Sequence, residues 1–247
     1  MGAKLNGKHT KTDYGLKLLA IEISIPETLS EREQLPGRNT YVNTGNRGIF
    51  GQHPIKLTFK CSEDYYEWIE RIEKVSADIN GQEVEVELDE NPGYFYYGIA
   101  TVSTTKENGV ISDFEISILA DPFKYGSQIS VSIGTAGSKE IEVQGNYETP
   151  CIIELVPSGA ISKYTIKGAA RDPVTGEAED ITIKSLSAGK TIVIDGEACL
   201  VTEDGLNKYS DTEMWEFPTL LSGSNTLTFE SSSVPCNVTV KYRPRSI

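Results

Sequence analysis

Apolar and polar residues alternate along much of the first half of the chain. Four segments show the pattern most clearly: Leu19–Ile25, Ile55–Phe59, Val84–Leu88 and Phe114–Ile118. A period of two is typical of a β-strand that buries one face and exposes the other to solvent. The pattern therefore predicts half-buried strands through most of this half.

One segment of the first half has helical spacing instead. Tyr65, Trp68 and Ile72 fall on one face of a 3.6-residue repeat. Ser62 is placed to cap its N-terminus, and acidic residues follow it where the helix dipole favours them. The pattern predicts a single helix from Glu63 to Lys74, packed on the strands.

The second half has short strand candidates and no helical segment. The candidates are Cys151–Val156, Lys163–Lys167, Asp180–Lys184, Thr191–Asp195, Ala198–Thr202, Glu213–Phe217, Thr226–Glu230 and Asn237–Tyr242. Many short strands separated by turn residues predict a β-sandwich. A Gly- and Ser-rich stretch, 126–145, separates the halves, so we expect two domains, 1–128 and 129–247. The expected fold class is mainly β with one α-helix.

The segment from Ser30 to His53 is long for a connection inside a compact domain. It contains two turn sequences, 36–39 and 45–48, each with a glycine beside or near an arginine. Connections of this length are usually functional or disordered. The arginine and asparagine residues suit contacts with a neighbouring protein, and a solvated mobile loop explains them equally well.

The charge balance excludes one class of partner. The chain has 247 residues, with 23 Lys and Arg against 36 Asp and Glu, and a net charge of −13. Surfaces that hold nucleic acid need clustered basic residues, so we expect no specific nucleic acid. The polar N-terminus lacks the apolar segment of a signal peptide, and no stretch reaches the roughly 18 apolar residues that span a bilayer. We therefore expect no membrane partner and synthesis in a cytoplasm.

The four cysteines have spacings that match no zinc site. They are Cys61, Cys151, Cys199 and Cys236. We expect buried, reduced thiols on strands and no bound metal, although two disulfides would use the same four residues.

The sequence shows no catalytic constellation. His9 lies in a polar segment and His53 precedes a proline, and neither stands in a recognisable triad context. The motif at 189–191, Gly-Lys-Thr, precedes a strand and not a helix, so it predicts a hairpin turn instead of a phosphate-binding loop. We therefore predict no enzymatic activity, no catalytic residue and no cofactor.

Two clusters admit a second interpretation. Glu83, Glu85 and Glu87 could be catalytic carboxylates of a glycosidase, but all three share the solvent face of one strand. A catalytic pair needs two different environments that drive the two pKa values apart, and this strand offers only one. The aromatic run Tyr94–Tyr97 fits an alternating strand, which we favour, and also a platform on which sugar rings stack.

Several motifs occur in an order that is typical of a known family. Met214–Phe229 contains Trp-x-Phe, a leucine pair and a Gly-x-Asn turn before an alternating strand. Pro122–Tyr125 forms a Pro-aromatic-x-Tyr step at the end of the first half. In these features the chain resembles the distal tail protein (Dit) family of siphophages and prophages of Gram-positive bacteria. It departs from the family pattern in the first loop. Members of the family often have Gly-Arg-Asp-Gly there, whereas in this chain Asn39 and Thr40 follow Pro36–Arg38.

The resemblance implies a structural virion protein at the tail tip, assembled in the host cytoplasm. Residues 1–128 would form a homo-hexameric ring, the baseplate hub between the tail tube and the tip. Residues 129–247 would form a galectin-like β-sandwich outside the ring. The implied partners are further copies of the chain, the tail tube protein, the tail-associated lysin of the tip, and receptor-binding proteins.

The alternative function is a carbohydrate-binding module that recognises the host surface. The His-x-Asn-Pro-Arg and Trp-Gly-x-Glu motifs of sugar-binding galectins are absent, because Glu216 and Phe217 follow Trp215. We therefore expect no specific oligosaccharide binding. For the ring we expect a neutral to acidic channel, since a basic lining would retain the phosphates of passing DNA.

Overall fold

The structure, a computed structural model, describes most of the chain. The described residues are 1–29, 32–37, 39–43, 49–60, 64–107, 110–134, 137–172, 174–230 and 234–247. Their contacts divide the chain into two compact units, residues 1–124 with Ile247, and residues 125–246. Both units are built mainly of strands, so the predicted fold class is confirmed. The roles expected for domains 1–128 and 129–247 stay predictions.

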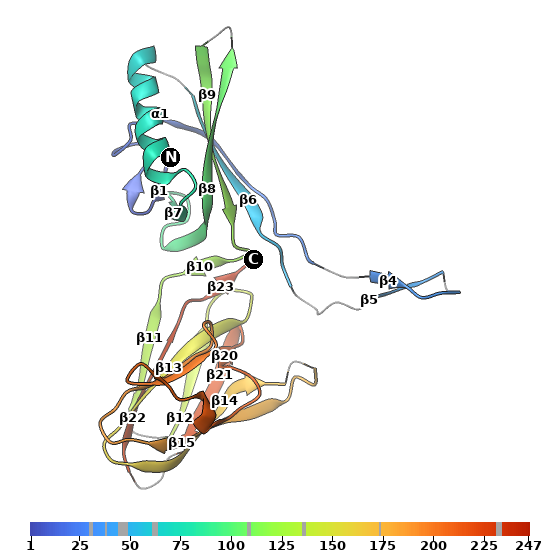
Figure 1. Cartoon of the computed structure of the whole chain (residues 1–247), viewed down its shortest axis with the longest axis vertical. Coiled ribbons are helices and arrows are strands. Elements are labelled where there is room, and N and C mark those ends of the chain that lie inside the picture. Colours follow the sequence, from blue (N-terminus) through green and yellow to red (C-terminus); the bar gives the residue numbers. More distant parts are fainter. Residues whose placement is uncertain are drawn as a thin grey trace. The chain divides into compact units, whose positions relative to one another are not determined.

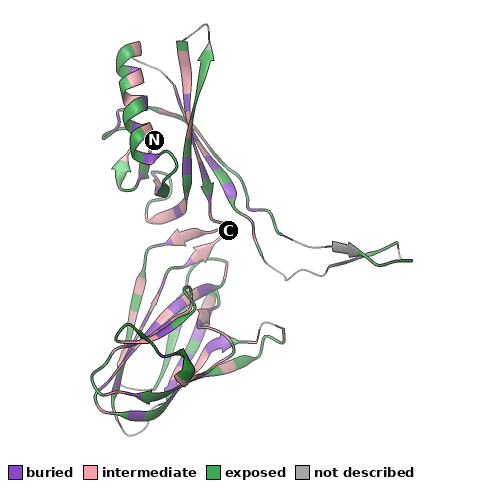
Figure 2. Cartoon of the chain, viewed as in Figure 1, coloured by how far each residue is buried: buried purple, intermediate pink, exposed green. Residues whose placement is uncertain are grey.

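The first unit is built on one antiparallel sheet. Along its strands buried residues alternate with more exposed ones, as the sequence pattern predicts (Figure 2). From edge to edge the order is β2 (Lys8–His9), β1 (Ala3–Leu5), β7 (Glu83–Leu88), β8 (Tyr94–Glu107), β9 (Val110–Ala120), β6 (His53–Lys60) and β3 (Leu18–Ile23).

A helix, α1 (Tyr65–Ile79), lies beside this sheet (Figure 1). The carboxylate of Asp64 caps it by accepting a hydrogen bond from the backbone N–H of Tyr66 at 2.9 Å. The buried Trp68 meets the ring of Phe114 edge-on, with the ring centroids 6.4 Å apart. The apolar stripe of the helix therefore completes the core of the first unit.

The predicted helix was too short at its C-terminal end. It continues beyond Lys74 because Val75 and Ile79 extend the buried stripe by another turn. It stops before Gly81, whose φ of +74° suits a glycine after a helix. The proposed cap, Ser62, lies outside the described residues, and Asp64 caps the helix instead.

The segment 30–53, expected as a long loop, contains a hairpin. β4 (Arg32–Gln34) pairs with β5 (Tyr41–Asn43) in a two-stranded sheet of its own. Before and after it, Thr28 and Phe50 form an isolated bridge. Residues 38 and 45–48 lie outside the described residues, so the contact role of this segment stays a prediction.

Strand β3 is shorter and less buried than the alternation over 19–25 indicates. A bulge near Leu19 shifts its register against β6, and its pairing ends at Ile23. Leu19 is exposed, and Ile25 is 82% exposed. The reason is position: β3 is the last strand of the described sheet, so no neighbouring strand covers its outer side.

The second unit is a sandwich of two antiparallel sheets. Among the described residues, one sheet has the order β11 (Ile129–Gly134), β22 (Cys236–Tyr242), β13 (Thr149–Pro157), β16 (Ile192–Asp195), β17 (Leu200–Glu203) and β18 (Leu206–Asn207), with β20 (Thr219–Leu220) also paired to β13. The other has the order β12 (Gly137–Val143), β21 (Gly223–Glu230), β14 (Ile161–Arg171), β15 (Ala178–Leu186) and β19 (Thr212–Glu213). Side chains from both sheets, including Ile153, Tyr164 and Phe229, share one core.

Three short elements complete the second unit. A single 3₁₀ turn, η1 (Tyr209–Asp211), links β18 to β19. At the start of the unit β10 (Lys124–Gly126) pairs with β23 (Arg245–Ser246), and Gly126 donates a hydrogen bond to the carbonyl of Pro244 at 2.8 Å.

Two strand predictions in the second unit need correction. The candidate Glu213–Phe217 is a strand only at Glu213, because the chain crosses from the β15 edge of one sheet to β13 of the other before Thr219. The crossing places Trp215 outside the core, 89% exposed. The candidate Ala198–Thr202 begins only at Leu200, after a tight turn.

Candidate assembly surface

The free edge of β3 combines unpaired backbone with apolar side chains. Ser24 donates a backbone hydrogen bond to the carbonyl of Pro54 at 3.2 Å, so the backbone groups of Ser24 point towards β6. In an antiparallel ladder neighbouring residues point the other way, which directs the N–H and C=O groups of Ile21 and Ile23 outward. No strand of the described residues occupies that side. Such an edge is a template for pairing with another chain.

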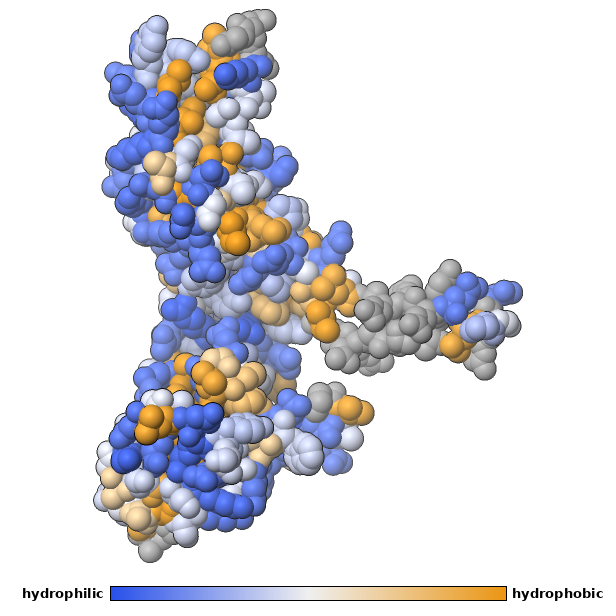
Figure 3. All heavy atoms as spheres, viewed as in Figure 1, coloured by the Kyte–Doolittle hydropathy of each residue, from blue (hydrophilic) through white to orange (hydrophobic). Residues whose placement is uncertain are grey.

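Further exposed apolar residues continue this edge towards the hairpin. The backbone N–H of Leu29 bonds the carbonyl of Ile49 at 2.8 Å, and both side chains are about half exposed. Apolar side chains gather where the chain leaves the sheet for β4 and β5 (Figure 3). A contiguous exposed apolar surface is typical of a protein–protein contact. We call Leu19, Ile25, Leu29 and Ile49 the edge patch.

The sheet face opposite the buried one is mainly polar, and its acidic side chains outnumber its basic ones. Its central strands carry Thr101 and Ser103 on β8 and Glu115 on β9, which pair in register across the face. On β6, Lys56 pairs with Ser117 and Lys60 pairs with Asp113. Because hydroxyl groups dominate, this face has no concentrated positive charge.

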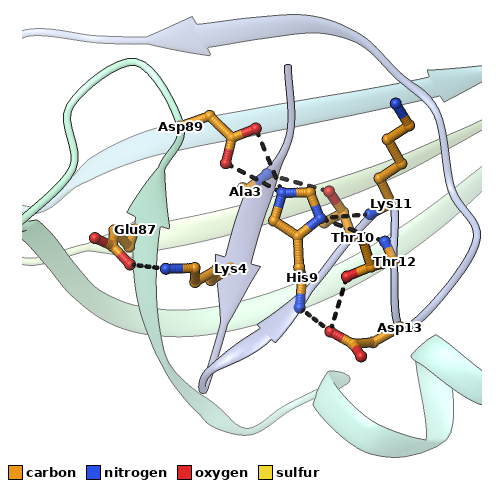
Figure 4. A network of polar contacts seen from close by, with 9 residues as sticks. All are labelled: Ala3, Lys4, His9, Thr10, Lys11, Thr12, Asp13, Glu87 and Asp89. Carbon is orange, nitrogen blue, oxygen red and sulfur yellow. Dashed lines mark hydrogen bonds and ion pairs between the residues drawn. The ribbon is translucent and has the colours of Figure 1, made fainter.

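His9 is held in a structural network and not in a catalytic one (Figure 4). Its Nδ1 accepts hydrogen bonds from the backbone N–H groups of Lys11 and Thr12, at 3.1 and 3.4 Å. The other ring nitrogen, Nε2, therefore carries the proton and donates to Asp89 at 3.1 Å. With Nδ1 occupied by backbone donors, the ring shapes the N-terminal turn and has no free nitrogen to act as a base.

The other histidine and the glutamate triplet are also parts of the fold. His53 is buried and meets the ring of Tyr96 edge-on at 6.2 Å. Glu85 accepts a hydrogen bond from the hydroxyl of Tyr97 at 2.7 Å. Glu87 pairs with Lys4 at 2.8 Å, and this bond, with one from the backbone N–H of Gly93, lowers the pKa of the Glu87 carboxyl. Glu83 is exposed on the same strand.

The remaining sequence candidates have structural surroundings. Tyr94–Tyr97 belongs to β8, where Tyr96 is buried and the ammonium group of Lys124 lies 4.8 Å from the ring centre of Tyr94. One face of the Tyr94 ring is therefore already in contact. At 189–191, the backbone N–H of Gly189 bonds the carbonyl of Pro157 at 2.7 Å in the turn before β16, as predicted.

The described thiols are free. Cys151 and Cys236 are buried on strands, and burial raises the pKa of Cys151 to about 12 and that of Cys236 to about 11. Cys199 is exposed in a turn and not on a strand as expected. Cys61 lies outside the described residues. Within the described part of the chain no cluster of three metal-ligating side chains occurs, and no helix is long and apolar enough to cross a membrane.

Comparison with known proteins gives a family for part of the chain and a fold for all of it. Residues 144–245 match the family model of the siphovirus-type tail component, C-terminal domain. Residues 144–245 therefore form a C-terminal domain of the siphovirus-type tail component family. The crystal structure of Dit from phage SPP1, described as a paradigm of the hub adsorption apparatus in phages that infect Gram-positive bacteria, has the same fold over the whole length. It covers 100% of this chain and 99% of that one, with a TM-score of 0.75 and 14% identity.

A second structure is more distant from the tail component. A chain of the phage p2 baseplate in its activated conformation with Sr aligns over 96% of this chain and 97% of that one, with a TM-score of 0.39 and 11% identity. No curated protein sequence matches the tail component. The resemblance inferred from Met214–Phe229 and Pro122–Tyr125 is thus confirmed by the family match and the shared fold.

The alternation over Leu19–Ile25 marks the strand at this edge but not most of the edge patch. Leu29 and Ile49 are isolated apolar residues in a polar segment, so no periodicity marks them. Only the pairing of their backbones brings them together.

Proposed function

We propose that this tail component forms a closed homo-hexameric ring, the hub that joins the tail tube to the tail tip. The observation that carries the proposal is the edge patch, an apolar strand edge without a partner among the described residues. Ring closure would cover that edge in every copy at once, which a monomer has no means to do. The likeness of fold to a protein described as a hub paradigm supports the same role.

In this proposal the polar sheet face suits a channel. Its hydroxyl and acidic groups offer no row of Lys and Arg to retain DNA phosphates. The net charge of −13 per copy makes the subunits repel one another, so the contacts between them must be apolar or charge-paired. The edge patch would supply an apolar contact of this kind.

The proposal includes a purely structural role without enzymatic activity. Both nitrogens of His9 are engaged in structural bonds, and the glutamates of β7 are bonded to neighbours or exposed. Its partners would be the tail tube protein, the lysin of the tip and receptor-binding proteins, and assembly would take place in the host cytoplasm. The expectation of no specific saccharide binding also stays a prediction.

The first prediction tests assembly through the edge patch. Tail tips made with the wild-type protein should show a six-fold ring around the tube axis in electron micrographs. Tips made with Ile25→Glu combined with Leu29→Glu should lack the ring, because each copy would place charges in the contact. The purified variant should keep its thermal melting temperature, since both side chains are exposed.

Leu206→Glu is the matched control, since Leu206 is also exposed but lies in the second unit. Its tail tips should keep the ring. The proposal fails if the protein lies away from the tube axis, or if the double variant assembles as the wild type does.

A further inference from the structure

A small cavity of about 80 Å³ opens in the second unit, beside the paired strands β10 and β23. Its lining includes three basic side chains, Lys241, Arg243 and Arg245, and one acidic side chain, Glu197. The lining therefore carries a net charge of +2, in a chain whose net charge is −13. A concave surface of one charge concentrates ions of the opposite charge, so this cavity attracts anions.

Arg245 is held in place from its backbone to its guanidinium group. Its backbone N–H donates to the hydroxyl of the buried Thr149 at 3.2 Å, and its carbonyl accepts from the N–H of Asn146 at 3.1 Å. The guanidinium group lies over the ring of Tyr125, 5.3 Å from the ring centre, and the side chain is only 14% exposed. A guanidinium group that is fixed in advance loses little conformational freedom when it binds an anion.

This guanidinium group already meets a carboxylate in the cavity. Glu197, in the turn after β16, pairs with Nη2 of Arg245. The Glu197 side chain is 66% exposed, so water screens the pair and a competing carboxylate is able to displace it. Lys241 is more firmly engaged, because Glu154, which lies outside the lining, accepts its hydrogen bond at 2.6 Å. Arg245 is therefore the cation to which an incoming carboxylate would bind.

The uncharged part of the lining fits a small apolar group. Pro150 and Ile152 of β13 line the cavity together with the ring of Tyr125. An engineered cavity of roughly 150 Å³ holds one benzene ring, and this cavity is about half as large. It therefore has room for a carboxylate and a small side chain, and it is too small to enclose a sugar ring.

We propose that this cavity binds the C-terminal carboxylate of a partner protein whose last residue is small and apolar. The planar guanidinium group of Arg245 would donate two parallel hydrogen bonds to the carboxylate, which displaces Glu197. The last side chain would lie against Pro150 and Ile152. Capture of a chain end is a recurring mode of peptide recognition. The site lies wholly in the second unit, so it goes beyond ring formation and does not depend on it.

The second prediction uses an NMR titration of the isotope-labelled full-length protein with N-acetyl-Gly-Gly-Val as the probe. The peptide should bind saturably at neutral pH, and the same peptide with a C-terminal amide should not bind. Arg245→Lys should weaken binding by about tenfold, because lysine keeps the charge and loses the planar pair of donors. Its melting temperature, recorded alongside, shows whether the fold is kept.

Glu197→Gln should tighten binding by about twofold to fivefold, because it removes the internal competitor. Glu197 is exposed, so this variant should fold as the wild type does, and a purely structural role of Arg245 would not produce the gain. Glu230→Gln is the matched control. Glu230 is an exposed carboxylate on β21 that pairs with Lys167 outside the cavity, and its loss should leave binding unchanged.

Four results would overturn the proposal. The first two are the absence of saturable binding and equal binding of the amide peptide. The third is an unchanged affinity in the Glu197→Gln variant. The fourth is tighter binding of inorganic phosphate, or of a peptide with an internal glutamate and a C-terminal amide, because either would show that the cavity does not select a chain end. None of them bears on whether the first unit forms a ring.

Discussion

At the scale of single residues, Gly98 shows how close the backbones of the first unit lie. A Cβ atom at this position would overlap the carbonyl oxygen of Leu119 and lie 2.7 Å from the Cα of Ala120. Gly98 pairs with Ala120 across β8 and β9. Moving the strands apart to make room for a side chain would therefore break the hydrogen bonds between them. The position requires glycine because of space and not because of an unusual φ.

The third prediction follows from this packing. Gly98→Ala should lower the free energy of unfolding by about 1–3 kcal/mol, because the added methyl forces the two strands apart. Gly51→Ala is the matched control, since its Cβ would meet the Leu29 side chain at 3.5 Å and the Glu27 carbonyl oxygen at 3.8 Å, both ordinary contact distances. Urea unfolding measures both. Equal stability of the two variants would show that β8 and β9 adjust without cost.

At the scale of elements, one buried lysine joins three parts of the sandwich edge. The ammonium group of Lys208 donates to the carbonyl of Ser185 at 2.9 Å and pairs with Glu203 at 3.2 Å and Asp211 at 3.0 Å. These partners belong to β15, β17 and η1, and therefore to both sheets. The Lys208 side chain is 7% exposed, so water screens the cluster little.

The fourth prediction is that Lys208→Met destabilises the protein by about 3–5 kcal/mol, because it leaves Glu203 partly buried without its counter-charge. Lys184→Met is the control. Its ion pair with Glu213 is half exposed on both sides, so the loss should stay below about 1 kcal/mol. Thermal and urea unfolding test the difference. Similar losses in the two variants would contradict a special role for the buried cluster.

At the scale of the whole molecule, carboxyl groups couple stability to pH in both units. In the first, hydrogen bonds from Lys4 and Gly93 lower the pKa of Glu87. In the second, a hydrogen bond from the backbone N–H of Ser187 lowers the pKa of Glu203, and Lys208 adds to it. A carboxyl with a lowered pKa in the folded state stabilises that state above its unfolded pKa, and the contribution is lost as the pH falls through the folded pKa.

The fifth prediction is that acid unfolds both units. The melting temperature should be steady near neutral pH and fall below about pH 4.3, where unfolded glutamate takes up its proton. Glu203→Gln should lower stability at neutral pH and reduce the further loss in acid, because that carboxylate no longer titrates. Calorimetric scans across the pH range measure this. A melting temperature that does not change between neutral and acidic pH would contradict the assignment.

The sequence alone determined the features that repeat locally. Alternation fixed the inner strands, such as Ile55–Phe59 and Phe114–Ile118, because each side chain's burial follows from its strand face. The spacing of Trp68 and Ile72 located the helix for the same reason. The motif of Met214–Phe229 is also local in sequence, and it lies within the segment that matches the tail component domain.

The tertiary structure decided everything that depends on which strands become neighbours. Ile23 and Ile55 pair with each other and are chemically identical, but β3 is an edge strand and β6 is an inner one, so Ile23 is exposed and Ile55 is buried. Trp215 is exposed because its segment crosses between sheets. Lys208 meets Glu203 only because β17 and η1 lie together. Local periodicity carries no information on strand order, and strand order sets these environments.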